Sequence, residues 1–169
     1  MLNFVTEGAR EGLILTPSMR VEEQWVDYNG HLNMAYYNVL FDRAADIVFA
    51  EFGLGPDYLK QTNASFFTLE VHVTYLREVH AGDMVETTFR TVGFDEKRIH
   101  VFQELYHCGE GFLSATSEGM LMHVDMGLKK SSPFPADVFA RIKACHDRQA
   151  NLPLPRQLGH VIGLPPKKA

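Results

Sequence analysis

The sequence predicts an α+β fold in which a curved antiparallel sheet wraps around one long apolar helix. Apolar side chains recur at spacings of three and four residues over 34–52, which is the period of a buried helix. After this helix the apolar period changes to two, in four runs separated by short turns. Short turns join antiparallel neighbours, because parallel strands need a long crossover.

A first strand is expected over residues 19–26, followed by a polar, turn-prone stretch over 27–33. Asn29 or Asn33 would cap the helix that follows. Only a narrow polar edge interrupts the apolar surface of this helix, so we expect other structure to enclose most of it. The stretch 53–56 contains two glycines and a proline and supplies the stop signal.

The remaining residues divide into strands, one short helix and a tail. The strands are expected over residues 67–75, 85–91, 99–105 and 112–126, and an amphipathic helix over 136–146. Residues 1–148 would form a single domain. The proline-containing residues 149–169 would form an extended or loose tail.

Composition limits the class of protein. A chain of 169 residues suits one compact domain or one subunit of an oligomer. Its net charge of −5 argues against a protein that coats nucleic-acid phosphates, so no nucleic-acid partner is expected. The two cysteines are too few for a disulfide scaffold, and no signal peptide or membrane-spanning stretch is recognisable. We expect a cytoplasmic protein with no membrane partner.

The segment before the long helix concentrates reactive side chains. Asp27 could attack a thioester carbon, or it could take a proton from a water that does so. Asn29 and His31 could orient that water, the carboxylate or the developing oxyanion. The alternative is that these residues serve only as turn and capping residues, which is their commonest use.

The start of the helix suits the same chemistry. Its unpaired main-chain N–H groups and partial positive charge can hold an oxyanion. We expect the N–H groups near residues 31–34, including those of Asn33 and Met34, to play this part. Gly30 would let a substrate carbonyl approach the backbone closely.

Residues 27–33, together with Tyr36, resemble the thioesterase signature of the hotdog-fold family. They are similar to the Asp-x-Asn-x-His segment of acyl-ACP thioesterases and to the loop aspartate of 4-hydroxybenzoyl-CoA-type thioesterases. The resemblance extends over residues 21–126. A narrower resemblance to betainyl-CoA thioesterases of carnitine breakdown rests on residues 24–37, 41–44, 76–78 and 95–100.

This resemblance implies hydrolysis of an acyl thioester, with Asp27 as nucleophile or general base and with Asn29 and His31 assisting. It also implies a homodimer or homotetramer whose active sites are built across the interface. Acyl-ACP enzymes carry two hotdog repeats and this chain has room for one, which favours a coenzyme A ester. The narrower resemblance implies a small, betaine-like acyl group.

A quaternary ammonium group is held by aromatic rings, each contributing about 0.5–2 kcal/mol. The residues expected to line the acyl pocket are Trp25, Tyr28, Tyr36, Tyr37, Phe66 and Glu70. Each ring could equally be ordinary core, and Glu70 could lie on the solvent side of its strand.

Basic residues after two turns are candidates for the phosphates of coenzyme A. These are Arg77, Lys97 and Arg98, with Lys129 and Lys130 as further candidates. Solvated surface charge is the alternative for each of them.

Several enzyme classes lack their signatures. The histidines show no metal-type spacing, so no metal is expected. There is no Gly-x-Ser-x-Gly elbow and no Gly-rich phosphate loop. We therefore expect no cofactor, with coenzyme A entering only as part of the substrate.

Three functions remain open. The leading hypothesis is an acyl-CoA thioesterase that acts on a small acyl group, with betainyl-CoA as the candidate substrate. A dehydratase or hydratase on the same fold would use His31 and Asp27 to move a proton on an enoyl thioester. A non-catalytic acyl-CoA-binding module would bind without turnover, since a fold alone does not fix a function.

Overall fold

The computed structural model describes residues 1–8 and 10–164. Its sheet is antiparallel and has the order β1-β4-β5-β6-β3, with β2 pairing to β4 and β7 to β6. The strands are β1 (Ile14–Leu15), β2 (Met19–Arg20), β3 (Ala64–Tyr75), β4 (Met84–Phe94), β5 (Arg98–His107), β6 (Leu113–Asp125) and β7 (Lys130–Ser131). The helices are η1 (Glu23–Trp25), α1 (Met34–Phe52), α2 (Pro56–Thr62) and α3 (Ala136–Gln149). The predicted α+β class is confirmed.

The long helix α1 has the bounds that its apolar period predicts. At its start, the side chain of Asn33 accepts a hydrogen bond from the N–H of Ala35, which makes Asn33 the cap. At its end, Gly53 takes the left-handed conformation with a φ of 91°, where glycine carries no steric cost.

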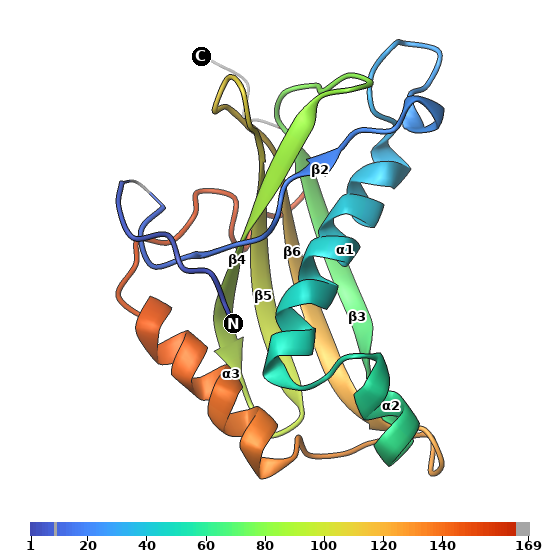
Figure 1. The fold of residues 1–169 in the computed structure, drawn as a ribbon, viewed down its shortest axis with the longest axis vertical. Coiled ribbons are helices and arrows are strands. Elements are labelled where there is room, and N and C mark those ends of the chain that lie inside the picture. The colour runs from blue at the N-terminus through green and yellow to red at the C-terminus, as the bar shows by residue number, and fades with distance from the viewer. Residues whose placement is uncertain (9, 165–169) are drawn as a thin grey trace.

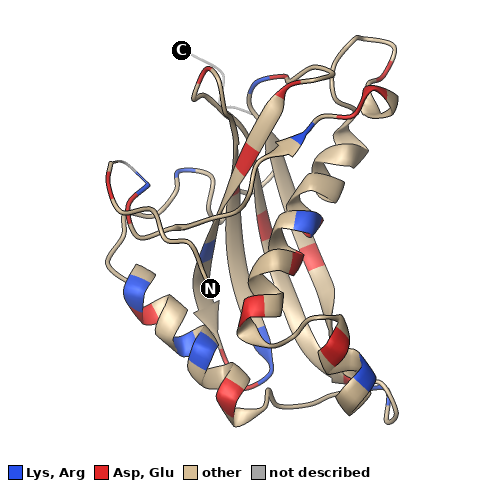
Figure 2. Ribbon diagram, viewed as in Figure 1, with Lys and Arg blue, Asp and Glu red and all other residues tan. Residues whose placement is uncertain are grey.

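α1 crosses the curved sheet, and α3 covers the same face beside it (Figure 1). We call this covered face the inner face and the opposite one the outer face. The side of α1 away from the sheet stays open in the single chain, where Ile47 is 42% exposed. Acidic residues outnumber basic ones along the helix (Figure 2). The expectation that α1 is mostly enclosed is therefore wrong for one chain, because one sheet covers only one side of a helix.

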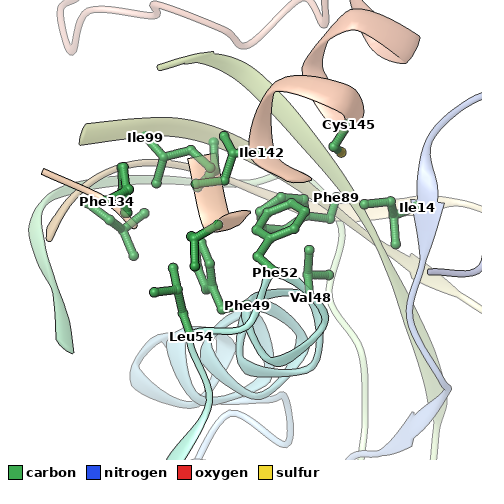
Figure 3. Packing of buried hydrophobic residues seen from close by; sticks show 13 residues of the cluster. Ile14, Val48, Phe49, Phe52, Leu54, Phe89, Ile99, Phe134, Ile142 and Cys145 are labelled. Carbon is green, nitrogen blue, oxygen red and sulfur yellow. The ribbon is translucent and has the colours of Figure 1, made fainter. Parts of the chain in front are cut away.

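The core lies between α1, α3 and the inner face of the sheet. Phe49 and Phe52 of α1 meet Phe89 of β4 edge to face, with ring centroids 5.8 Å and 6.4 Å away (Figure 3). Ile142 of α3 belongs to the same cluster and is fully buried. Edge-to-face pairs of this kind add about 0.5–1.5 kcal/mol beyond the burial of their surface.

Three predicted stretches differ from the structure in the elements that they form or in where these end. The strand expected over residues 19–26 is wrong beyond Arg20, because the chain turns through η1 and buries Trp25. The stretch 53–56 ends α1 as predicted but also begins α2, with Pro56 at the first helical position where its missing N–H costs nothing. The short C-terminal helix runs to Gln149, three residues beyond the expected end, because the side chain of Gln149 is buried against β4.

β3 is an edge strand with a break in its alternation. A bulge between Thr68 and Glu70 shifts the register, so that Phe66 and Thr68 before it and Val71 after it all face inward. Large apolar side chains remain uncovered on this strand. Exposed fractions are 46% for Phe67, 52% for Leu69, 45% for Val71 and 44% for Tyr75.

The segment after α3 crosses the outer face of the sheet. Arg90 donates to the main-chain oxygen of Leu152 at 3.4 Å, and the Gly159 N–H donates to Glu118 at 2.7 Å. The rings of His160 and His72 meet edge to face. The segment includes turns and contacts the sheet as far as His160. The end of the predicted tail, residues 165–169, lies outside the described part of the chain. None of the helices in the described part of the chain is long and apolar enough to cross a membrane.

Candidate active site

A short loop turns the chain back immediately before α1. Val26 and Leu32 pair as an antiparallel bridge across it. The Asp27 N–H donates to the main-chain oxygen of His31 at 3.0 Å, and the Gly30 N–H donates to that of Asp27 at 2.9 Å. The φ of Gly30 is 81°, a conformation that favours glycine. These contacts fix Asp27 relative to the helix.

The carboxylate of Asp27 is half-buried and borders a cavity of about 290 Å³. Its Oδ1 accepts the N–H of Asn29 at 2.8 Å, and its other oxygen makes no hydrogen bond with a residue that the structure describes. The cavity is lined by Asp27, His31, Leu32, Met34, Tyr37, Tyr75, Leu76, Arg77 and Glu78. One carboxylate oxygen is held in place while the other is available to react.

The start of α1 offers main-chain N–H groups near this cavity. Those of Leu32 and Asn33 each donate to a main-chain oxygen of a neighbouring segment at 2.9 Å, and that of Ala35 donates to the Asn33 side chain. Within residues 32–35, only the N–H of Met34 lacks a partner among the described residues. Over the stretch 31–34 expected to hold an oxyanion, the N–H groups of His31 and Met34 have no partner among the described residues. That of Met34 belongs to the first turn of α1, where the helix dipole is positive.

Two tyrosines form one wall of the cavity. The rings of Tyr37 and Tyr75 meet edge to face, with centroids 5.1 Å apart. The Tyr75 hydroxyl donates to the main-chain oxygen of Met34 at 3.2 Å. Burial raises the pKa of both phenols above the ordinary value of 10.0, so both hydroxyls stay protonated at neutral pH.

Charged groups surround Asp27. His31 and Glu78 line the cavity, and the ring of His80 stands edge-on to that of His31 at 5.3 Å. A hydrogen bond from its own main chain lowers the pKa of Glu78, and the neighbouring His31, His80 and Arg77 lower it further. Glu78 is therefore ionised at neutral pH.

Of the three predicted catalytic residues, the structure brings Asp27 and His31 to one cavity. The side chain of Asn29 is exposed and lies outside the lining, and its main-chain N–H is the group that contacts Asp27. Asn33 caps the helix, and Met34 lines the cavity.

The aromatic residues predicted for the acyl pocket do not form one cage within a single chain. Only Tyr37 lines the Asp27 cavity. Trp25 is buried and stacks on Tyr36 with centroids 5.6 Å apart, and the guanidinium of Arg43 covers the Trp25 ring at 5.0 Å. Tyr28 is 97% exposed at the loop tip.

Phe66 and Glu70 fall on opposite faces of the sheet because of the bulge in β3. Phe66 faces inward and lies 4.4 Å from Phe49, centroid to centroid. Glu70 is exposed on the outer face beside His72 and His100. Glu70 therefore lies on the solvent side of its strand, which was the alternative to a place in the acyl pocket.

The basic residues predicted for coenzyme A separate into two places. Arg77 lines the Asp27 cavity, where it pairs with Glu110 at 2.8 Å and lies 3.7 Å from the Phe112 ring centre. Lys97 and Arg98 lie where the turn after β4 leads into β5, at the opposite end of the sheet. This is about 25 Å away along β5 at 3.3 Å per residue. Within one subunit they share no cavity with Asp27.

Tyr75 and Glu78 belong to the cavity and were not singled out from the sequence. In the sequence, Tyr75 is recognisable only as the last apolar residue of an alternating strand. Glu78 is recognisable only as part of the narrower family resemblance. No group of three or more His, Cys, Asp or Glu side chains within the described residues is arranged to hold a metal ion.

Comparison with known proteins gives a consistent result. The family model described as the thioesterase-like superfamily matches residues 21–142. A betainyl-CoA thioesterase of Pseudomonas aeruginosa is 41% identical over 154 residues, which cover 91% of this chain and 97% of that protein.

Solved structures share the fold at recognisable sequence identity. A Staphylococcus aureus protein solved in complex with CoA superposes with a TM-score of 0.85 at 31% identity, covering 90% of this chain and 96% of that one. A putative thioesterase from Pseudomonas putida KT2440 superposes with a TM-score of 0.78 at 36% identity, covering 90% of this chain and 97% of that one. The curved antiparallel sheet with its packed helix is the hotdog fold of such thioesterases.

Proposed function

The chain belongs to the thioesterase-like superfamily, and from this premise we propose that it hydrolyses betainyl-CoA to betaine and free CoA. The resemblance to a betainyl-CoA thioesterase extends over nearly the full length of both chains. The observation that carries the proposal is that Asp27 and Met34 line one cavity, where one Asp27 carboxylate oxygen and the Met34 N–H have no partner among the described residues.

In the proposed reaction, the thioester carbonyl oxygen accepts a hydrogen bond from the Met34 N–H, where the helix dipole stabilises the developing oxyanion. In one route the free oxygen of Asp27 bonds to the carbonyl carbon, the C–S bond breaks, and CoA leaves as a thiolate. Water then hydrolyses the resulting anhydride. In the other route Asp27 takes a proton from water as the water oxygen bonds to that carbon, and the proton passes to the departing sulfur.

The remaining residues take supporting parts in this proposal. The Asn29 N–H holds one Asp27 oxygen and leaves the other oriented toward the substrate. His31 orients the water. Arg77, at the cavity that contains Asp27, is the proposed contact for a phosphate of CoA.

The proposed active form is a homodimer joined along β3. This edge strand of 12 residues leaves main-chain groups unpaired and exposes a row of apolar side chains, which is the arrangement that pairs with another strand. Asp42 and Asp46 of α1 line a cavity together with Phe66 and Val71 of this strand. We place the protein in the cytoplasm, where its two free cysteines, Cys108 and Cys145, stay reduced.

A direct assay tests the proposed function. Purified protein is given betainyl-CoA, acetyl-CoA, octanoyl-CoA and crotonyl-CoA, and released thiol is measured with a thiol reagent. We expect thiol release with the highest kcat/KM for betainyl-CoA. Loss of enoyl absorbance from crotonyl-CoA without thiol release would instead identify a hydratase. Saturable binding of betainyl-CoA without thiol release would identify a binding module.

A further inference from the structure

A second cavity, of about 340 Å³, lies between α1 and the inner face of β3, β5 and β6. We call it the α1 groove. Its walls include the aromatic side chains of Phe41, Phe49 and Phe66. The polar residues in its lining include Asp42 and Asp46 on the rim and Gln103 in the sheet. None of these polar residues takes part in the Asp27 cavity.

Gln103 is the residue of this groove whose buried side-chain oxygen has no hydrogen-bond partner among the described residues. It points inward from β5 and is only 5% exposed. Its Oε1 is buried and makes no hydrogen bond with any residue in the described part of the chain. A buried carbonyl without a partner is unfavourable, and such groups are rare in folded proteins. A cation in the groove would interact favourably with the negative end of this amide dipole, without forming an N–H hydrogen bond to it.

Two carboxylates stand one helical turn apart on the rim of the groove. Neither Asp42 nor Asp46 pairs with a lysine or arginine among the described residues. Partial burial raises the pKa of Asp46, and the like charge of Asp42 raises it further. A cation between α1 and the sheet would offset the repulsion between the two carboxylates.

The rings beside these groups suit a cation that carries no N–H. Phe49 and Phe66 lie 4.4 Å apart, centroid to centroid, with their planes tilted by 40°. Ring faces attract quaternary ammonium groups and need no hydrogen-bond donor from them. Aromatic walls combined with negative charge at the rim therefore match a trimethylammonium group better than a primary amine.

The part of the α1 groove that holds Asp42 and Asp46 is too far from Asp27 of the same chain to share one acyl group. Asp42 lies nine residues after the cap Asn33, about 14 Å along the helix axis at 1.5 Å per residue. In betainyl-CoA the quaternary nitrogen is only two bonds from the thioester carbon. A groove that holds this nitrogen must therefore belong to a different copy from the attacking Asp27.

The relative direction of α1 and β3 allows two copies to share one acyl site. The start of α1 is tied to the end of β3 by the Tyr75–Met34 hydrogen bond, and its last turns pack on Phe66 near the start of β3. α1 thus runs antiparallel to β3. Pairing two β3 strands about a two-fold axis brings the Asp27 end of one copy toward the Phe66 end of the other.

We propose that the α1 groove holds the quaternary ammonium end of an acyl group whose thioester is attacked by Asp27 of a second copy, with Asp46 and Gln103 as the residues that select the cation. This subsite rests on the proposed function. It makes charge, and not only size, the property by which the acyl group is chosen.

The first test compares betainyl-CoA with 3,3-dimethylbutyryl-CoA, in which a carbon replaces the nitrogen without change of shape. The wild type should prefer the cationic ester. Asp46→Asn should lower kcat/KM for betainyl-CoA by about tenfold and leave the neutral ester within about twofold. Gln103→Leu should shift the preference in the same direction. Glu51→Gln, which removes the same charge from α1 outside the groove, should change neither.

The outcomes separate the subsite from the proposed function. Wild-type protein that releases no CoA from betainyl-CoA would remove both. Wild-type activity on betainyl-CoA with an unchanged substrate preference in Asp46→Asn and Gln103→Leu would overturn the subsite alone. Equal losses on both esters in a variant whose far-ultraviolet circular dichroism matches the wild type would also overturn it, because a charge-selecting residue must distinguish the two substrates.

A mixed dimer tests the sharing between copies. Chains carrying Asp27→Asn and Asp46→Asn, each with its own affinity tag, are co-expressed and the doubly tagged dimer is purified. If the two residues come from different copies, one site holds both changes and the other holds none. The dimer should then show about half of the wild-type kcat/KM on betainyl-CoA, with full preference for the cation. A kcat/KM no higher than that of the Asp46→Asn homodimer would overturn the arrangement.

Discussion

The hydroxyl of Tyr75 donates a hydrogen bond to the main-chain oxygen of Met34, 3.2 Å away. This contact joins the end of β3 to the first turn of α1 through two residues that are 41 positions apart in the sequence. It also fixes the Tyr75 ring against Tyr37 at the wall of the Asp27 cavity. The position of the Met34 N–H, our candidate oxyanion donor, therefore depends on the end of a strand.

Removing this hydroxyl should affect catalysis more than folding. Tyr75→Phe loses one partly exposed hydrogen bond, so the free energy of unfolding should fall by about 0.5–1.5 kcal/mol. The kcat should fall by about threefold to tenfold, because the first turn of α1 is less well positioned. Urea unfolding and steady-state kinetics measure the two effects.

Tyr58→Phe is the matched control for this change. It removes a hydroxyl that bonds to His123 at 2.8 Å, far from the Asp27 cavity. Its stability should fall by a similar amount while kcat stays at the wild-type value. A Tyr75→Phe enzyme with unchanged kcat would contradict a positioning role for the Tyr75 hydroxyl.

Asp27→Asn should abolish most of the activity without unfolding the protein. The amide oxygen of Asn can still accept the N–H of Asn29, so the loop keeps its hydrogen bond. The side chain can neither attack the thioester nor accept a proton, so kcat should fall by about a thousandfold or more. Thiol release and thermal unfolding are the measurements. An Asn variant within tenfold of the wild type would exclude Asp27 as nucleophile or base.

Some of the fold followed from sequence patterns because those patterns are local. The bounds of α1 are set by its apolar period, by Asn33 at the start and by Gly53 at the end, all within one stretch of chain. The strand predicted over 19–26 failed because alternation alone cannot distinguish a strand from a turn that buries Trp25. The bulge at Thr68 was likewise invisible, because nothing in a single strand shows which register its neighbour accepts.

The residues of the candidate site likewise separate into those that a local pattern predicts and those that long-range contacts bring in. Asp27 and His31 could be predicted from the sequence because one short loop carries both to the start of a helix. Tyr75 and Glu78 reach the cavity only through pairing of β3 with β6, which depends on long-range contacts. Within one subunit the sheet places Arg77 at the opposite end of β5 from Lys97 and Arg98, a separation that no local pattern could show.

The turn between β4 and β5 should contribute to stability in a pH-dependent way. Asp95 accepts the N–H groups of Lys97 and Arg98 and pairs with the Arg98 side chain, and the Arg98 contacts in particular lower the pKa of Asp95 below 3.8. A carboxyl whose pKa is lower in the folded state stabilises it above the unfolded pKa, and this stabilisation is lost as pH falls through the folded value.

The pH prediction is tested with Asp95→Asn. The free energy of unfolding of the wild type should decline as pH falls below about 4, and the decline should be shallower in the variant, which lacks the Asp95 carboxyl. Asp57→Asn is the control, because Asp57 is exposed and pairs only with Lys60 on α2. Parallel curves for wild type and Asp95→Asn would contradict the role of this turn.

Charging the edge of the sheet should separate the proposed dimer. Leu69 is 52% exposed on β3, so Leu69→Lys costs a single subunit little but would bury a lysine at a strand pairing. Analytical ultracentrifugation should show wild-type dimers and a monomeric variant, and the variant should lose kcat because Asp27 no longer meets the groove of a second copy. Leu154→Lys, at a site 71% exposed and away from β3, should remain dimeric and active. A Leu69→Lys enzyme that is monomeric and fully active would show that one subunit suffices.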